Sequence, residues 1–121
     1  MTKQEIEELK EKLNYFYGTE NYFNNPLIKY LYTDGVKYFA STTNSYWLLN
    51  EINFIYCDLL KINKGEFLNI KVVSKNNKAD IIVDDGNDNI LKKKHISFTD
   101  LPEGEWKFFL TNNILLLPSE Y

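Results

Sequence analysis

The chain has one cysteine and one histidine, Cys57 and His95, and these are the first candidates for catalytic chemistry. Histidine titrates near neutral pH, and a thiol that contacts it can act as a nucleophile when an acid orients the ring. The helical pattern around Cys57 places it away from the apolar stripe, so a Cys57–His95 pair is disfavoured, although the sequence leaves open whether the two meet. One Cys and one His are also too few for a structural zinc site. We therefore expect no catalytic residue, no metal and no cofactor.

Three acids surround Gly86, in the run Asp84-Asp85-Gly86-Asn87-Asp88. A tight calcium loop needs ligands at alternating positions and a bidentate Glu about seven residues later. The chain continues instead into apolar residues and lysines. Asp, Gly and Asn are the residues that a hairpin turn selects, and the turn interpretation is favoured.

The run Lys92-Lys93-Lys94 precedes His95 and is the only dense positive segment. All fourteen basic residues of the chain are Lys, and the absence of Arg disfavours sequence-specific nucleic-acid binding. On a strand, at most two of these three lysines share a face. Lysines that protect an edge strand from aggregation are the favoured interpretation, and weak nucleic-acid binding is the alternative.

Aromatic residues make up 16% of the chain, with nine Tyr, eight Phe and two Trp. They cluster around the end of the first expected helix and in the hairpin expected after it. Tyr is favoured at interfaces because its ring is apolar and its hydroxyl forms hydrogen bonds. Core packing accounts for most of these rings, and the surplus predicts a protein interface, with a homodimer or with a foreign protein. The two clusters are Tyr15, Phe16, Tyr17, Tyr22 and Phe23, and then Tyr30, Tyr32, Tyr38 and Phe39.

The elements that position these residues belong to one expected domain, residues 1–121. The hydrophobic fraction of 44% and the charged fraction of 26% are typical of a globular protein. No apolar run approaches the roughly 18 residues of a membrane span, and the first residues lack the pattern of a secretion signal. We expect an intracellular protein without a membrane partner.

Two helices and a hairpin are predicted in the first half of the chain. Thr2 and Glu5 form a capping box for a helix that ends near Gly18, with an apolar face at Ile6, Leu9, Leu13 and Phe16. Residues 27–32 and 36–40 flank Asp34-Gly35, a pair that favours a hairpin turn. Asn44 is the expected cap of a second helix over roughly 45–62, with its buried stripe at Leu48, Ile52, Ile55, Leu59 and Ile62.

The second half of the chain has the period of strands. Short turns separate these strands, and strands joined by short turns pair antiparallel. We predict an α+β fold, in which two helices pack on one face of a curved, mainly antiparallel sheet of about six or seven strands. The strands are expected at about 66–73, 80–84, 89–98, 105–111 and 114–117.

Six segments of the chain resemble an uncharacterised family of small proteins from phages, prophages and other bacterial mobile elements. The resemblance runs from about residue 15 onward, and Leu-Leu-Pro-Ser-Glu-Tyr is its most specific part. It implies no catalytic residue; it implies the cytoplasm of a bacterial host and an accessory role there. The segments are residues 16–20, 32–38, 46–49, 85–87, 98–100 and 115–121.

The preferred hypothesis is a non-enzymatic protein-protein interaction module that inhibits a host defence system, most concretely an anti-CRISPR protein that blocks a Cas effector. Cas effectors hold nucleic acid in positively charged channels, which a compact acidic protein of net charge −3 could occupy. The alternatives are a small enzyme or ligand-binding module using His95 and nearby Tyr, or a weak nucleic-acid binder through Lys92–Lys94. The expected partner-binding residues are Tyr30, Tyr32, Tyr46, Phe54, Asp84, Asp85, Asp88, Glu120 and Tyr121.

Overall fold

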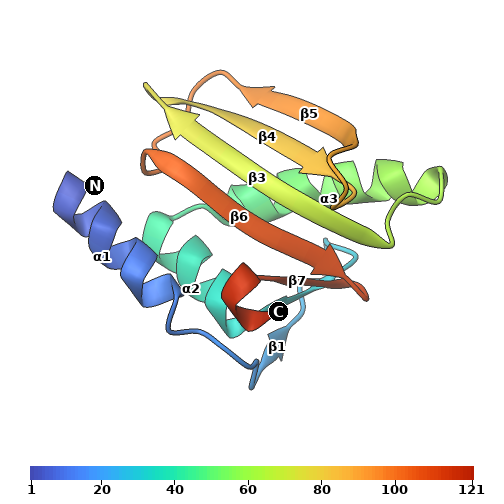
Figure 1. Cartoon of the computed structure of the whole chain (residues 1–121), viewed down its shortest axis with the longest axis horizontal. Helices are drawn as coiled ribbons and strands as arrows, with labels where there is room; N and C mark the ends of the chain where they lie inside the picture. Colours follow the sequence, from blue (N-terminus) through green and yellow to red (C-terminus); the bar gives the residue numbers. More distant parts are fainter.

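Three helices lie on one side of a seven-stranded sheet in the computed structural model, which describes residues 1–121 (Figure 1). The helices are α1 (Lys3–Leu13), α2 (Asp34–Thr43) and α3 (Tyr46–Lys61), and a short 3-10 helix, η1, covers Pro118–Glu120. The strands are β1 (Tyr22–Phe23), β2 (Leu31–Thr33), β3 (Phe67–Lys75), β4 (Lys78–Asp84), β5 (Ile90–Ile96), β6 (Gly104–Thr111) and β7 (Ile114–Leu116).

The strand order across the sheet is β1-β2-β7-β6-β3-β4-β5. Every neighbouring pair is antiparallel except β2 and β7, which run parallel. The predicted α+β class, with a mainly antiparallel sheet, is therefore confirmed. The parallel pair brings residues 31–32 beside residues 114–115, so two segments far apart in the sequence meet there.

The predicted hairpin around Asp34-Gly35 is wrong, because these two residues begin α2. Thr33 caps this helix: its side-chain oxygen accepts a hydrogen bond from the backbone N–H of Val36, at 3.3 Å. The helical period is present in the sequence, since Val36, Phe39, Ala40 and Thr43 are all buried on one side of α2. The molecule consequently has three helices where the sequence predicted two.

The ends of the two predicted helices also differ from expectation. The capping box of Thr2 and Glu5 is confirmed, but α1 ends at Leu13, and Gly18 lies in the following loop with a φ of +70°. Asn44 does not cap the next helix; it ends α2 in the left-handed conformation, with a φ of 53°. Ser45 is the residue before α3, which the sequence placed correctly to within a residue at each end.

The core lies between the helices and one face of the sheet. Along β3 and β4 alternate residues are buried, so that one face of the sheet packs on the helices and the other does not. Ring contacts join the layers, with Phe39 of α2 packing on Trp106 and Phe108 of β6. We call the uncovered face of β3–β6 the open sheet face; its residues are Phe67, Asn69, Lys71, Val73, Lys75, Lys78, Asp80, Ile82, Asp84, Lys93, His95, Glu105, Lys107, Phe109 and Thr111.

Asparagines make the tight turns between the predicted strands. Asn76-Asn77 and Asn112-Asn113 all have positive φ, a conformation that Asn tolerates better than most residues. Each pair joins two strands of the sheet in the predicted place. None of the helices is both long and apolar enough to cross a membrane.

Candidate functional site

A groove lined by aromatic side chains lies beside α2, on the side of that helix turned away from the sheet. It has a volume of about 650 Å³, within the range of about 300–1,000 Å³ that is usual for binding sites. Residues 15–23 form one wall and the outer side of α2 forms the other. We call it the aromatic groove; its rings are Tyr15, Phe16, Tyr17, Phe23 and Tyr38, and its charged residues are Glu20, Asp34 and Lys37.

The amphipathic character of α2 positions one wall of the groove. Val36 and Phe39 are buried against the sheet, whereas Lys37, Tyr38 and Ser41 point to the other side and line the groove. The rings of Tyr38 and Phe16 are 5.4 Å apart, so α2 holds the facing wall by aromatic contact. The groove is therefore built on a helix that is fixed in the core.

Hydrogen bonds fasten the loop that forms the other wall. The backbone N–H of Asn21 donates to the carboxylate of Asp34 at 3.0 Å. The hydroxyl of Thr19 donates to the carboxylate of Glu120 at 3.4 Å. Both bonds connect the loop to the N-terminal end of α2, directly or through Glu120. The loop is thus held at two points although it has little regular secondary structure.

The carboxylate of Glu120 lies buried at the start of α2, where it links four segments. It accepts hydrogen bonds from the hydroxyl of Thr33 at 2.6 Å, from the backbone N–H of Gly35 at 3.2 Å and from that of Leu117 at 3.0 Å. An anion at this place also suits the positive end of a helix dipole. A Cβ on Gly35 would lie 2.5 Å from Leu117 and 2.6 Å from Glu120, so only glycine fits.

The expected role of Glu120 as a partner-binding residue does not agree with this position, because its side chain is already surrounded by the chain's own donors. The Glu120 junction, as we call Glu120 with Thr33, Gly35 and Leu117, instead supports the wall of the groove. Two of the segments on which the family resemblance rests, 32–38 and 115–121, contact each other at this junction.

The groove has aromatic surface together with charge of both signs. Tyr15 and Tyr17 are 67% and 77% exposed, and neither contributes to the core. The ammonium group of Lys37 lies 4.2 Å from the centre of the Phe23 ring, a cation–π distance. Glu20 and Asp34 lie in the same lining. Rings beside carboxylates can bind an apolar segment that carries a basic side chain.

Two of the tyrosines predicted to bind a partner are buried in the free chain. Tyr30 is 2% exposed and donates from its hydroxyl to the carbonyl of Leu49 at 2.6 Å. Tyr32 is 8% exposed and stacks on Phe23, one of the groove rings. Burial raises the pKa of both hydroxyls above the ordinary value. Tyr32 lies in the short strand β2 inside the sheet and Tyr30 directly precedes that strand, so neither belongs to the predicted hairpin.

Two of the other predicted aromatics are at the surface on α3. Tyr46 is 41% exposed, and its hydroxyl is 2.8 Å from that of Ser41, a groove residue, so Tyr46 lies next to the aromatic groove. Phe54 is 62% exposed, about two turns further along the same helix. Tyr121 is 72% exposed but packs on Phe67 and Phe109, on the open sheet face.

The acidic cluster forms the turn between β4 and β5, as the turn interpretation predicts. One Asp84 oxygen accepts from the N–H of Gly86 at 2.8 Å, and Asp85 accepts from the N–H of Asn87 at 2.8 Å. A bond from the Asn89 side chain is the largest of the effects that lower the pKa of Asp85. Asp88 is exposed and has a φ of 64°. The turn shares no lining residue with the aromatic groove, so these acids are separate from Tyr15 and Tyr17, although Gly86 of the turn lies beside Phe67, the ring on which Tyr121 packs.

The structure places His95 and Cys57 on different sides of the sheet. The imidazole lies on the open sheet face, with its Nδ1 2.8 Å from a carboxylate oxygen of Asp80. The thiol is half-buried on α3, near the side-chain oxygen of Asn53. Neither lines the aromatic groove. The two residues therefore do not form the thiol–imidazole relay considered from the sequence.

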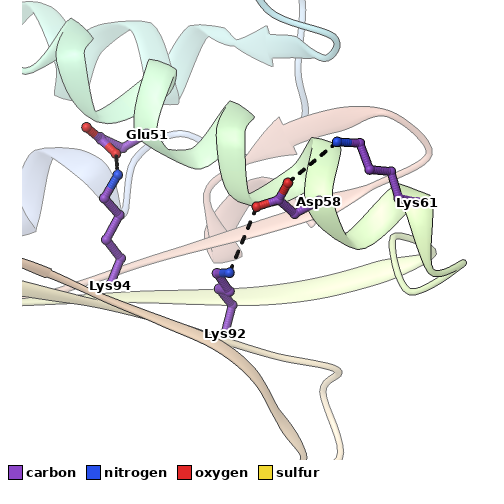
Figure 2. A network of polar contacts seen from close by, with 5 residues as sticks. All are labelled: Glu51, Asp58, Lys61, Lys92 and Lys94. Carbon is purple, nitrogen blue, oxygen red and sulfur yellow. Dashed lines mark hydrogen bonds and ion pairs between the residues drawn. The ribbon is translucent and has the colours of Figure 1, made fainter.

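The three lysines of β5 are divided between the two faces of the sheet. Lys94 pairs with Glu51, and Lys92 lies 3.9 Å from Asp58, a residue that also lies 3.9 Å from Lys61 (Figure 2). Lys93, between them, points to the open sheet face. The prediction that at most two of the lysines share a face is confirmed, and those two are paired with acids of α3.

The sequence analysis indicated the groove's loop but not its second wall. The aromatic cluster at residues 15–23 was noted, but none of its rings was distinguished from the core, and Tyr15 and Tyr17 were not chosen as partner-binding residues. Asp34 and Lys37 were missed because they were assigned to a turn and a strand. The signal that could have found them is the helical spacing of the apolar residues between 36 and 43.

Comparison with known proteins places the chain in a family but gives it no relative of known activity. No curated protein and no solved structure matches it. One family model, described as a family of unknown function (DUF6876), matches residues 7–121, which include all of the aromatic groove and the Glu120 junction. The chain is therefore a member of the DUF6876 family.

Proposed function

We propose that this protein is a non-enzymatic protein-binding module that covers a surface of its partner, with the aromatic groove as the main contact. The observation that carries the proposal is the exposure of Tyr15 and Tyr17 on a concave surface whose walls are held by the core. Exposed tyrosines on a rigid support are typical of binding hot spots, because they bury much area and lose little conformational freedom.

The chemistry of the groove favours a partner with a basic surface. Glu20 and Asp34 lie among the rings, and the hydroxyl of Tyr15 lies 3.5 Å from Glu11 on the acidic side of α1. A lysine or arginine of the partner would contact a ring and a carboxylate at the same time. The net charge of −3 acts in the same direction over longer distances.

The narrower form of the proposal is inhibition of a bacterial defence protein, such as a Cas effector. It is supported by the resemblance to proteins of phages and mobile elements, and by the positively charged channels in which such effectors hold nucleic acid. In this form the protein competes with nucleic acid for a basic channel, and it needs no catalytic residue.

The test compares binding by the wild type with that of a double variant, Tyr15→Ala/Tyr17→Ala. Phe98→Ala is the matched control, because Phe98 is 78% exposed and lies outside the groove. Purified protein is assayed for binding to, and inhibition of, a panel of Cas effectors from bacterial hosts. We expect the double variant to lose at least a tenfold factor in affinity, about 1.4 kcal/mol, and the control to keep it.

Three outcomes would contradict the proposal or a part of it. A panel with neither binding nor inhibition would exclude the narrower form. If a partner is captured and reconstituted but binds the double variant as tightly as the wild type, the groove is not the contact surface. Loss of activity in a folded His95→Ala variant would favour the enzyme hypothesis instead.

A further inference from the structure

The open sheet face concentrates positive charge on an acidic protein. It carries Lys71, Lys75, Lys78, Lys93 and Lys107, against three acids, although the chain as a whole has net charge −3. No helix covers this face (Figure 1). A positive patch on an acidic chain attracts anions locally, in spite of the overall charge.

Three of these lysines form one row across four strands. In the register of the sheet Lys107 pairs with Lys71, Lys71 with Ile82, and Ile82 with Lys93. Neighbouring strands are about 4.8 Å apart, so the row extends over about 14 Å, which is long enough for two or three successive phosphates of a single strand. A row of this kind runs across the strands and cannot be recognised from any one segment of the sequence.

The charge of this row is only partly neutralised within the chain. Glu105 is shared between Lys71 and Lys107, at 3.8 Å and 3.7 Å. Lys93 forms no ion pair, whereas its neighbours Lys92 and Lys94 are both paired with α3 on the opposite face (Figure 2). At least two positive charges therefore remain available in the row.

Aromatic rings lie next to the lysine row. Phe109 is two residues from Lys107 on β6, and its ring is 5.3 Å from that of Tyr121 and 5.4 Å from that of Phe67. Tyr121 is 72% exposed, so one side of its ring is free for stacking. A cationic row beside exposed rings is the combination with which proteins bind single strands, phosphates on the cations and bases on the rings.

We propose that the open sheet face binds single-stranded nucleic acid without sequence preference. The lysine row contacts the phosphates, and the cluster of Tyr121, Phe109 and Phe67 stacks one base. The absence of Arg agrees with this, because lysines act as point charges for phosphate and give little base readout. This surface lies on the other side of the sheet from the helices and the aromatic groove, so the inference does not depend on the proposed protein-binding function.

The first experiment measures fluorescence anisotropy with labelled oligothymidylate and oligouridylate of about 12 nucleotides, within the site size of about 4–16 nucleotides that single-strand binders use. The full chain is titrated into each probe at several salt concentrations. We expect binding at low salt, with a slope of log K against log[salt] of about −2 for three phosphate contacts. The DNA and RNA arms identify which strand is preferred, and a duplex of the same length should bind more weakly because its bases are not free to stack.

The second experiment compares two charge reversals on neighbouring residues. Lys93→Glu and Lys92→Glu change the net charge equally, but Lys93 is on the open sheet face and Lys92 faces α3. We expect Lys93→Glu to weaken binding roughly tenfold and to make the salt slope shallower by at least about 0.7, with little effect of Lys92→Glu. Tyr121→Ala should weaken binding about fivefold without changing the slope. Circular dichroism checks that each variant is folded.

The proposal is overturned if neither probe binds at low salt. Equal losses in the Lys92 and Lys93 variants would mean that binding follows overall charge and not this face, and would also overturn it. If the duplex or a polyglutamate chain binds as tightly as the single strands, the site is a general polyanion surface, or one for an acidic protein, and the assignment to single-stranded nucleic acid is wrong.

Discussion

Two sets of charged contacts connect distant parts of this chain, and they differ in their exposure to water. At the Glu120 junction a buried carboxylate accepts hydrogen bonds from groups on three other segments. Between α3 and β5, Lys92 and Lys94 reach acids of the helix, but the side chains of both lysines are more than 40% exposed (Figure 2). The first is a buried cluster of hydrogen bonds. The second, which we call the border between α3 and β5, is a set of ion pairs exposed to solvent.

The difference teaches how much each contact contributes to stability. Water competes for exposed ion pairs, whose net contribution is about 0–1 kcal/mol. Donors that surround a buried carboxylate have no such substitute, and removing the acceptor leaves them desolvated and unpaired. The junction has one charged side chain and the contacts between α3 and β5 have five, so burial, and not the number of charges, decides the outcome. The following variants test this comparison, from the largest expected effect to the smallest.

Glu120→Ala is expected to have the largest effect, lowering the free energy of unfolding by about 3 kcal/mol. The loss has one cause: the Thr33 hydroxyl and the N–H groups of Gly35 and Leu117 lose their acceptor. Urea unfolding measures it, with the exposed Glu7→Ala as control, which should change the value by less than about 0.5 kcal/mol. A loss below about 1 kcal/mol would mean that water replaces the carboxylate, and the contrast with the ion pairs would disappear.

Gly35→Ala tests the packing of the same junction and should cost about 2 kcal/mol. The new methyl group would meet Leu117 and Glu120 at 2.5–2.6 Å, so the buried contact has to open. Gly18→Ala is the matched control: there is free space around Gly18, but its φ of +70° is strained for alanine, at a cost of about 1 kcal/mol. Thermal unfolding compares the two. A larger loss at Gly18 would show that backbone strain outweighs packing here.

Tyr30→Phe removes a buried hydrogen bond without charge and should cost about 1 kcal/mol at neutral pH. The hydroxyl of Tyr30 donates to the carbonyl of Leu49, and this hydrogen bond connects the residue before β2 to α3. The wild type also has a specific alkaline response. Because burial raises the pKa of Tyr30, the folded state holds this proton more tightly than the unfolded state, and stability falls as the pH rises above about 10.

The pH dependence measures the share of Tyr30 in the alkaline response, to which the raised pKa values of Tyr32 and Tyr56 also contribute. Unfolding is followed by fluorescence between neutral pH and pH 11, and the fall in stability should be smaller in Tyr30→Phe than in the wild type. Tyr15→Phe is the control for the substitution itself, since Tyr15 is 67% exposed and lies outside the core. An identical response in all three proteins would assign the alkaline effect to other groups.

Much of the fold could be predicted from the sequence because its second half depends on local signals. Asn-Asn and Asp-Gly turns and alternating apolar residues predict β3 to β7 to within two residues at each end. The Asp34-Gly35 pair misled the prediction because the same two residues suit a hairpin turn and the start of a helix. A capping Thr33 and a partner 85 residues further along the chain decide between them.

The candidate surfaces were less predictable, since each is assembled from separate segments. Tyr15 and Tyr17 were noted as part of a cluster, but their role as a groove wall depends on α2, which the sequence analysis did not find. The row of Lys107, Lys71 and Lys93 depends on strand order and register, and register is fixed by pairing across the whole sheet. Glu120 was expected to bind a partner, because a short acidic segment has no local signal that predicts burial.

The smallest effects are expected at the border between α3 and β5. Lys92→Ala should cost a few tenths of a kcal/mol, because Asp58 is 56% exposed and keeps Lys61 as a second partner. Lys94→Ala should cost more, up to about 1 kcal/mol, because Glu51 is only 25% exposed. In 1 M salt the Debye length falls to about 3 Å, so both losses should shrink, whereas the loss in Glu120→Ala should persist. A double-mutant cycle of Lys94→Ala with Glu51→Ala measures the coupling free energy of this ion pair. If the coupling exceeds about 2 kcal/mol and salt does not reduce it, the exposed ion pair is as strong as the buried contacts of Glu120. Exposure to water would then no longer explain the difference between the two regions.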